Sequence, residues 1–410
     1  MRYTGLLFGI VAMLAFIGCS DDPVSSTPEE AISSPSSKLT ISAGMAGGSR
    51  GQMPPARMFP QGVLTYDGIT SAALEGNLLG DPATRKMAIY LPPSYGMMPE
   101  KRYPTVYLLH GYLGGHETFP WSMNAFMQGV GLDLGLDIRT IADELISSGQ
   151  MEEMIIVMPE GGTAYGGSWY ANSPVIGNFR DYIAEEVVAY IDGKYRTIDS
   201  RDSRGISGHS MGGYGSLSLA MEYHEVFGGV AAMSPGFPND FGVSPTPIDG
   251  FLVENPEILG EPILVDMTQE TLDLFPVAGV IFSTNFSTNV FYAMASAFSP
   301  NPDKPPFYVD LPIEYPGKTV VEEVWEKWVE QDLVHQIARD GANLANTAIF
   351  VNQGVGPTIV MEEVPNVDLL IAALGDAGLT YTYEEVDGDH ITHLREQVSA
   401  VLTFLSANLE

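Results

Sequence analysis

The chain has 410 residues, of which 45% are hydrophobic and 17% charged, and its 51 acidic and 19 basic side chains give a net charge of −32. This apolar share is too high for a disordered chain, and the length is sufficient for one large domain or two ordinary ones. The acidic excess argues against a nucleic-acid partner, because phosphate binding requires a basic surface. The single cysteine, Cys19, excludes an internal disulfide framework and a cysteine-rich metal site.

Residues 1–18 have the pattern of a secretory signal peptide, with Arg2 followed by an apolar run that is too short for a comfortable transmembrane helix. The segment Phe16-Ile17-Gly18-Cys19 resembles the lipobox of bacterial lipoproteins. This resemblance implies cleavage before Cys19 and lipidation of its thiol. We therefore expect an exported protein that a lipid anchor holds on a bacterial membrane, facing the periplasm or the cell exterior. An ordinary signal peptide with an incidental cysteine is the alternative.

Residues 19–61 are rich in Ser, Pro and Gly and show no periodic apolar pattern. This composition is typical of a flexible tether, and roughly 40 such residues have a root-mean-square reach of about 35 Å. We expect the lipidated tether to hold a folded domain, residues 62–410, clear of the lipid head groups.

Strand and helix patterns alternate from about residue 63 onward. Continuous apolar strands between helices predict an α/β fold with a mostly parallel central sheet that is buried on both faces. The rhythm is lost over residues 234–322, which we interpret as a cap insertion after the sixth strand. The predicted strands are residues 86–91, 104–109, 153–158, 204–208, 229–233, 348–351 and 381–386, and the predicted helices are residues 179–195, 214–222, 325–339 and 394–409.

The sequence Gly208-His209-Ser210-Met211-Gly212 fits the G-x-S-x-G pattern and lies between a predicted strand and a predicted helix. Such a sharp turn exposes a serine Oγ, and the flanking glycines permit close approach of the backbone. The helix that follows favours developing negative charge at its N-terminus. Ser210 is therefore the candidate nucleophile, and a glycine-rich structural turn is the alternative.

The loop His110-Gly111-Tyr112 directly follows a predicted apolar strand. In folds with a G-x-S-x-G elbow, this loop and the residue after the serine supply the oxyanion-binding N–H groups. We therefore assign these donors to Tyr112 and Met211. His110 is interpreted as a histidine that orders the loop rather than as a base.

His390 follows the last predicted strand, and its position fits the chain order of serine, acid and histidine in such folds. We expect it to take the Ser210 proton and to return it to the leaving group. His393 is the competitor for this role. A metal site made by Asp387, Asp389 and the two histidines is a weaker alternative, so no metal or cofactor is expected.

These motifs together resemble the esterase D-like branch of the α/β-hydrolase superfamily. The resemblance spans about residues 85–409 and includes His110-Gly111, the Gly166 to Ser173 segment, the Ser210 elbow and Gly388-x-His390. It implies an α/β-hydrolase fold and a serine esterase acting on carboxylic esters. The Gly166 to Ser173 segment tends to lie near the family's active site, which makes Trp169 and Tyr170 candidate substrate-lining residues. Packing in the core is the alternative for both.

The sequence departs from this family where the acid of the triad is expected. The family's G-x-x-D pattern after the seventh strand is Gly354-Val355-Gly356-Pro357 here, with proline in place of aspartate. Glu362 is the first choice for a relocated acid, and Glu363 and Asp240 are the other candidates. A serine–histidine dyad without an acid also remains open.

Two functional classes follow from these residues. The first is an exported esterase whose small-molecule or polysaccharide-linked substrate is a carbohydrate, phenolic or siderophore ester; an acyltransferase that uses the same acyl-enzyme is a variant of it. The second is a binding protein on a hydrolase fold that has lost catalysis, which the missing acid favours. The sequence leaves the oligomeric state open.

Overall fold

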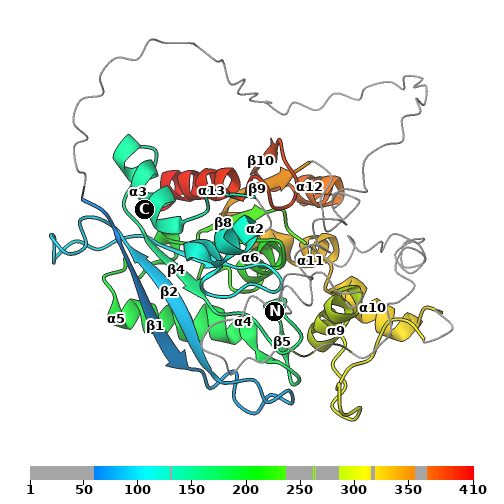
Figure 1. Cartoon of the computed structure of the whole chain (residues 1–410). Helices are drawn as coiled ribbons and strands as arrows, with labels where there is room; N and C mark the ends of the chain where they lie inside the picture. The colour runs from blue at the N-terminus through cyan, green and yellow to red at the C-terminus, as the bar shows by residue number, and fades with distance from the viewer. Residues whose placement is uncertain are drawn as a thin grey trace, which may run out of the picture. The chain divides into compact units, whose positions relative to one another are not determined.

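The main sheet of the computed structural model has eight strands in the order β1-β2-β4-β3-β7-β8-β9-β10 (Figure 1). The structure describes residues 60–129, 132–236, 262, 264, 286–314, 319–355 and 367–410. Strands β1 and β2 pair antiparallel, β2 pairs antiparallel with β4, and the remaining pairs are parallel. The strands are β1 (Val63–Thr70), β2 (Thr84–Leu91), β3 (Thr105–Leu109), β4 (Ile155–Pro159), β7 (Arg204–His209), β8 (Gly229–Met233), β9 (Ala348–Gly354) and β10 (Tyr381–Val386).

Successive side chains of the central strands enter two separate apolar clusters, one on each face of the sheet. On β2, Met87 and Ile89 belong to the first cluster, whereas Ala88 and Tyr90 belong to the second. This alternation follows from the two-residue period of a strand, and a sheet buried on both faces therefore has continuous apolar strands. The mostly parallel central sheet predicted from the sequence is confirmed.

Helices cover both faces of this sheet (Figure 1). The first cluster includes side chains of α6 (Met211–Glu222) and of the helical run α4 (Phe179–Asp181), η2 (Tyr182–Val187) and α5 (Val188–Lys194). The second includes side chains of α3 (Ile138–Ser148) and α13 (Leu394–Asn408). Other helical elements are η1 (Thr118–Ser122), α2 (Met123–Gly129), η3 (Arg201–Ser203), η5 (Gly341–Leu344) and α12 (Val367–Asp376). The short strands β5 (Asn172–Ser173) and β6 (Gly177–Asn178) form a separate pair.

The long connection between β8 and β9 contains helices that depart from the sequence expectations. Helix α9 (Phe286–Phe298) was not predicted, because its side chains from Thr288 onward are buried on all sides and show no amphipathic period. The single helix expected over residues 325–339 is two helices, α10 (Glu322–Glu330) and α11 (Leu333–Asp340). The Asp332 side chain accepts a hydrogen bond from Val334 N at 2.8 Å and caps the second of them.

The parallel strands bring their carboxyl ends to one edge of the sheet. The segments that follow β3, β7 and β10 begin or include His110, Ser210 and His390, respectively. In parallel α/β sheets this edge is where ligands bind. Residues far apart in the sequence therefore meet here, and the candidate site is built from these connections.

Candidate active site

Ser210 occupies the turn between β7 and α6 in a strained backbone conformation. Its φ of 57° and ψ of −117° lie outside the regions that residues with a side chain normally occupy. The Ser210 N–H donates to Met233 O at 2.9 Å, and its carbonyl accepts from Gly236 N at 3.0 Å. These bonds to the end of β8 hold the turn in place, and they leave the half-buried serine side chain at the start of α6.

The glycines of the elbow occupy positions at which a side chain does not fit. A Cβ atom on Gly212 would lie 2.2 Å from Leu109 O, and one on Gly208 would lie 2.3 Å from Gly212 O. Both obstacles are backbone atoms, which cannot rotate away. The G-x-S-x-G pattern therefore reflects how closely the start of α6 passes the end of β3.

The loop after β3 lies directly against the elbow. A Cβ atom on Gly111 would be 3.3 Å from Ser210 Cβ, so the backbone that leads into Tyr112 adjoins the serine. Met211 is the first residue of α6, and an N–H in the first turn of a helix has no acceptor within the helix. The Tyr112 hydroxyl donates to Tyr165 O at 2.8 Å. The structure thus brings together the two segments that contain the predicted oxyanion donors.

A buried carboxylate, Glu160, holds this loop at His116 and was not predicted. Its Oε2 accepts from the His116 backbone N–H at 3.0 Å and lies 2.9 Å from His116 Nδ1, while its Oε1 accepts from Gly162 N at 3.0 Å. Burial by itself would raise the pKa of Glu160, but its interaction with the His116 imidazole holds that pKa well below its usual range. The available sequence pattern was an acidic residue directly after β4, followed by two glycines.

Both ring nitrogens of His110 make hydrogen bonds, one within the loop and one to the segment that follows β4. Its Nε2 accepts from Gly161 N at 2.8 Å, so the proton lies on Nδ1, which is 2.8 Å from Gly111 O. The Tyr170 hydroxyl donates to the His110 carbonyl at 3.0 Å. These contacts are those of a histidine that orders the loop, as the sequence interpretation proposed.

His390 follows β10 and lies beside the residue that precedes Ser210. His209 Nε2 donates to His390 O at 2.7 Å, and the two ring centroids are 4.7 Å apart. A Cβ atom on Gly354, the last residue of β9, would lie 2.3 Å from Asp389 O, so the glycine permits this approach. Burial lowers the pKa of His390 well below its usual value, with a further contribution from His209. The imidazole is therefore neutral at neutral pH, as a general base must be.

The acid of a triad is not located among the described residues. His390 Nδ1 is buried and has no hydrogen-bond partner in this part of the chain. Asp389 is turned to its own loop, because its Oδ1 accepts from Ile391 N and Thr392 N at 2.7 Å each. The candidates Glu362, Glu363 and Asp240, together with Cys19 and Pro357, lie outside the described residues.

Trp169 and Tyr170 are buried, with 3% and 1% of their surface exposed. Their φ angles of 51° and 48° place both in the left-handed region. The Trp169 ring packs against Tyr214 and Phe298 at centroid distances of 5.5 and 5.9 Å. The burial and contacts of this pair favour core packing over the substrate-lining role.

Two features are absent from the described residues, a metal-binding cluster and a membrane-spanning helix. In that part of the chain, no group of three His, Cys, Asp or Glu side chains could hold a metal ion. Likewise, none of the helices there is long and apolar enough to cross a membrane.

Known proteins resemble this chain over part of its length. An esterase of Mycobacterium tuberculosis is 30% identical over 161 residues, which cover 38% of this chain and 30% of that protein. An endo-1,4-beta-xylanase/feruloyl esterase of Xylanibacter ruminicola is 30% identical over 151 residues, or 36% of this chain and 19% of that protein. The chain thus spans less than a third of each of these relatives.

Solved structures resemble it over most of its length. A ferulic acid esterase has 20% identity and a TM-score of 0.52, with 85% of this chain and 99% of that chain covered. An S-formylglutathione hydrolase from Agrobacterium tumefaciens has 17% identity and a TM-score of 0.50, with 86% and 97% covered. These likenesses show the α/β-hydrolase fold.

The sequence profile of the Esterase family, described as "Putative esterase", matches residues 82–394. That range contains the elbow, the loop after β3, the buried Glu160 and His390. The matched range is well over half of the chain and includes every strand of the main sheet except β1. This chain is therefore a member of the Esterase family with an α/β-hydrolase fold.

Proposed function

We propose that this protein is an exported, lipid-anchored serine esterase that hydrolyses carboxylic esters through an acyl-enzyme. The observation that carries the proposal is Ser210, held at φ 57° between a buried strand and a helix N-terminus. Backbone strain of this kind costs about 1–3 kcal/mol and clusters at active sites. Membership of the Esterase family supports the choice of substrate bond.

The proposed reaction is a double displacement. The Ser210 Oγ attacks the ester carbonyl carbon while the neutral His390 imidazole takes the hydroxyl proton, and backbone N–H groups of Tyr112 and Met211 bind the oxyanion. The C–O bond then breaks, and His390 returns the proton to the departing alcohol. Water, deprotonated by His390, attacks the acyl-enzyme and releases the carboxylic acid and free Ser210. None of these steps requires a cofactor.

The proposed substrates are extracellular esters of carbohydrates or phenolic acids. A lipidated Cys19 would place the enzyme outside the cytoplasm, where such esters occur. The names of a relative with feruloyl esterase activity and of a structural neighbour, a ferulic acid esterase, support this choice. A siderophore ester suits the same compartment.

A second candidate is a binding protein that has lost catalysis. It is favoured by the buried His390 Nδ1, which has no hydrogen-bond partner among the described residues, and by Pro357 at the family's acid position. Loss of the acid from a triad lowers the rate by about 10⁴-fold, because the imidazole then adopts the wrong tautomer. This candidate predicts no turnover and no covalent labelling at Ser210.

Hydrolysis of p-nitrophenyl acetate and butyrate by the whole chain, with labelling by a fluorophosphonate probe, separates the two candidates. We expect Ser210→Ala to lower turnover at least about 10³-fold and to abolish labelling. Ser207→Ala is the matched control, since Ser207 lies on the same strand and its buried Oγ has no hydrogen-bond partner among the described residues. Turnover that persisted in Ser210→Ala would contradict the proposal.

A further inference from the structure

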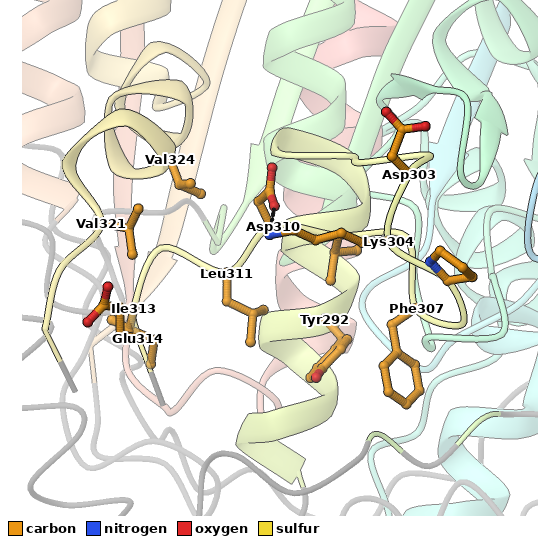
Figure 2. A pocket seen from close by; sticks show the side chains of 12 residues that line it. Tyr292, Asp303, Lys304, Phe307, Asp310, Leu311, Ile313, Glu314, Val321 and Val324 are labelled. Carbon is orange, nitrogen blue, oxygen red and sulfur yellow. Dashed lines mark ion pairs between the residues drawn. The ribbon is translucent and has the colours of Figure 1, made fainter. Parts of the chain in front are cut away.

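A cavity of about 660 Å³ lies between α9 and α10, in the connection between β8 and β9 (Figure 2). This volume falls within the range of about 300–1,000 Å³ that is typical of small-molecule sites. We call the cavity the cap pocket and define it by six of the residues that line it. These residues are Tyr292, Lys304, Phe307, Asp310, Leu311 and Glu314.

One wall of the cap pocket consists of two aromatic rings and aliphatic side chains. The rings of Tyr292 and Phe307 meet edge to face, with centroids 5.3 Å apart and planes inclined at 72°. Leu311 also lines the pocket, and in Figure 2 the side chains of Leu311, Tyr292 and Phe307 follow one another across the view. A wall of this kind binds the apolar face of a ring.

The charged groups of the pocket disfavour an anion. Lys304 Nζ already pairs with Asp310 Oδ1 at 2.5 Å, and Asn301 Nδ2 donates to the same carboxylate at 2.9 and 3.0 Å. Asp303 and Glu314 are exposed carboxylates that also line the pocket. An anionic group would meet three carboxylates and one lysine that is already paired, whereas hydroxyl groups can bond to these acceptors.

A single residue links the cap pocket to the loop after β3. The Tyr165 hydroxyl donates to Phe307 O at 2.9 Å, and the Tyr165 ring lies 5.8 Å from that of Tyr292. The Tyr165 carbonyl accepts the hydrogen bond from the Tyr112 hydroxyl at 2.8 Å. Hydrogen bonds through Tyr165 and the Tyr112 side chain therefore connect the pocket to the loop that contains the proposed oxyanion donor.

We propose that the cap pocket is a substrate subsite that binds an uncharged, hydroxylated ring of the ester. Such a ring comes either from the phenolic acid or from the sugar that carries the ester. The apolar face of the ring packs on Tyr292, Phe307 and Leu311, and its hydroxyl groups reach the carboxylates. The catalytic role of the subsite rests on the proposed esterase function, whereas ring binding itself does not.

Leu311→Trp tests the subsite, because the indole fills the space between the aromatic wall and the carboxylates. Leu369→Trp is the matched control, since Leu369 is an exposed leucine on α12 and does not line the pocket. Phe307→Ala is a second variant that removes one ring and keeps the carbonyl that accepts from Tyr165. Circular dichroism melting of each protein checks that it is folded.

The kinetic test compares three uncharged esters: ethyl acetate, which has no ring, methyl ferulate and acetylated xylobiose. We expect Leu311→Trp and Phe307→Ala to lower the kcat/KM ratio of one ring-bearing ester to ethyl acetate about tenfold, mainly through KM. The affected ester identifies the source of the ring as phenolic acid or sugar. Leu369→Trp keeps the wild-type ratios. Ratios that are equal in all four proteins overturn the subsite.

A binding test separates failure of the subsite from failure of the proposed function. Methyl ferulate and xylotriose are titrated calorimetrically into Ser210→Ala, with and without Leu311→Trp. Binding that Leu311→Trp weakens about tenfold supports the subsite even if the wild type hydrolyses no ester. Absence of binding of both probes, unchanged affinity in the double variant, or preference for a cationic glucosamine oligomer overturns it.

Discussion

The backbone conformation of Ser210 has a φ of 57°, which is unfavourable for a residue with a Cβ atom. Hydrogen bonds to β8 and to the segment after it are therefore needed to maintain this conformation. The hydrogen bonds to Met233 O and from Gly236 N offset this cost. The strain is thus a property of the folded sheet edge and not of the pentapeptide that contains the serine.

Glu160 is a positioning residue for the oxyanion loop, and Glu160→Gln tests this role. The substitution preserves shape but removes the charge and one of the acceptors that hold His116 and Gly162. We expect kcat for p-nitrophenyl acetate to fall about tenfold with little change in KM, because only the transition state uses the oxyanion donors. Glu160→Asp should recover part of the loss.

Glu153→Gln is the control for this prediction. Glu153 lies just before β4, and Glu160 lies just after it. The Glu153 carboxylate accepts hydrogen bonds from Ser94 N and Lys101 Nζ, which lie outside the candidate site. Both substitutions remove hydrogen bonds to a charged group, worth about 1.5–3 kcal/mol each in stability. Equal loss of kcat in both variants would show that Glu160 acts through stability alone.

The buried His390 predicts an unusual pH profile. Its pKa is lowered well below 6.5 by burial and by His209, so the neutral base persists at acidic pH. We expect kcat/KM to remain constant as the pH falls through 6.5 and to decline only well below that value. An acid limb near or above pH 7 would instead indicate a carboxylate partner of Nδ1, such as Glu362, because a nearby anion raises the pKa of an imidazole.

His209 makes stability depend on pH in the same direction. Burial lowers its pKa from 6.5 to about 4 in the folded state. Between these values the unfolded chain binds a proton that the folded protein does not bind, so stability is complete above pH 6.5 and falls by up to about 3 kcal/mol towards pH 4. Urea unfolding at pH 7.5 and 5 should show a smaller loss for His209→Gln than for wild type. An equal loss would assign the effect to other groups.

At the scale of elements, the contact between β3 and α6 depends on Gly212. A Cβ atom there would lie 2.2 Å from a backbone oxygen, so Gly212→Ala must displace either the strand end or the helix start. We expect a destabilisation of about 3 kcal/mol or more and loss of esterase activity.

Gly193→Ala is the matched substitution in a helix. A Cβ atom on Gly193 meets no atom within 4 Å, so alanine should stabilise α5 by up to about 1 kcal/mol and leave activity unchanged. Thermal unfolding of both variants measures the difference. Stability of Gly212→Ala equal to or above that of the wild type would contradict the close contact with Leu109 O.

The elements that sequence patterns predicted and those they missed differ in burial. Strands such as β4 and β8 are apolar throughout and were predicted. Strand β1 was missed because it lies at the sheet edge, where its residues are exposed or half-buried and form no apolar run. Helix α9 was missed because its side chains from Thr288 onward are all buried and show no amphipathic period. Helix α3 was not predicted, although residues typical of helix ends flank it. Asp137 caps its N-terminus, and Gly149 ends it in the left-handed conformation.

At the scale of the whole molecule, the proposed lipid anchor is tested by Cys19→Ser. Without its thiol the chain cannot be lipidated, so we expect the protein to move from the membrane fraction to the soluble fraction of a bacterial expression host. Acyl chains hold a protein on a membrane at about 0.8 kcal/mol per buried methylene. Ester hydrolysis should be retained, because Cys19 precedes the domain by a long segment. Equal membrane association of both forms would contradict the anchor.

The sequence by itself determined the α/β class, the elbow serine and the histidine after the last strand. Local spacing, apolar runs and glycine positions determine these features, and each lies within a short segment. Only the tertiary structure decided that Trp169 and Tyr170 are buried, that Glu160 holds the loop of His110, and that a pocket lies between α9 and α10. Glu160 meets the loop because β3 and β4 are parallel neighbours. The burial of Trp169 and Tyr170 and the shape of the pocket depend on how side chains pack in the folded protein rather than on sequence spacing.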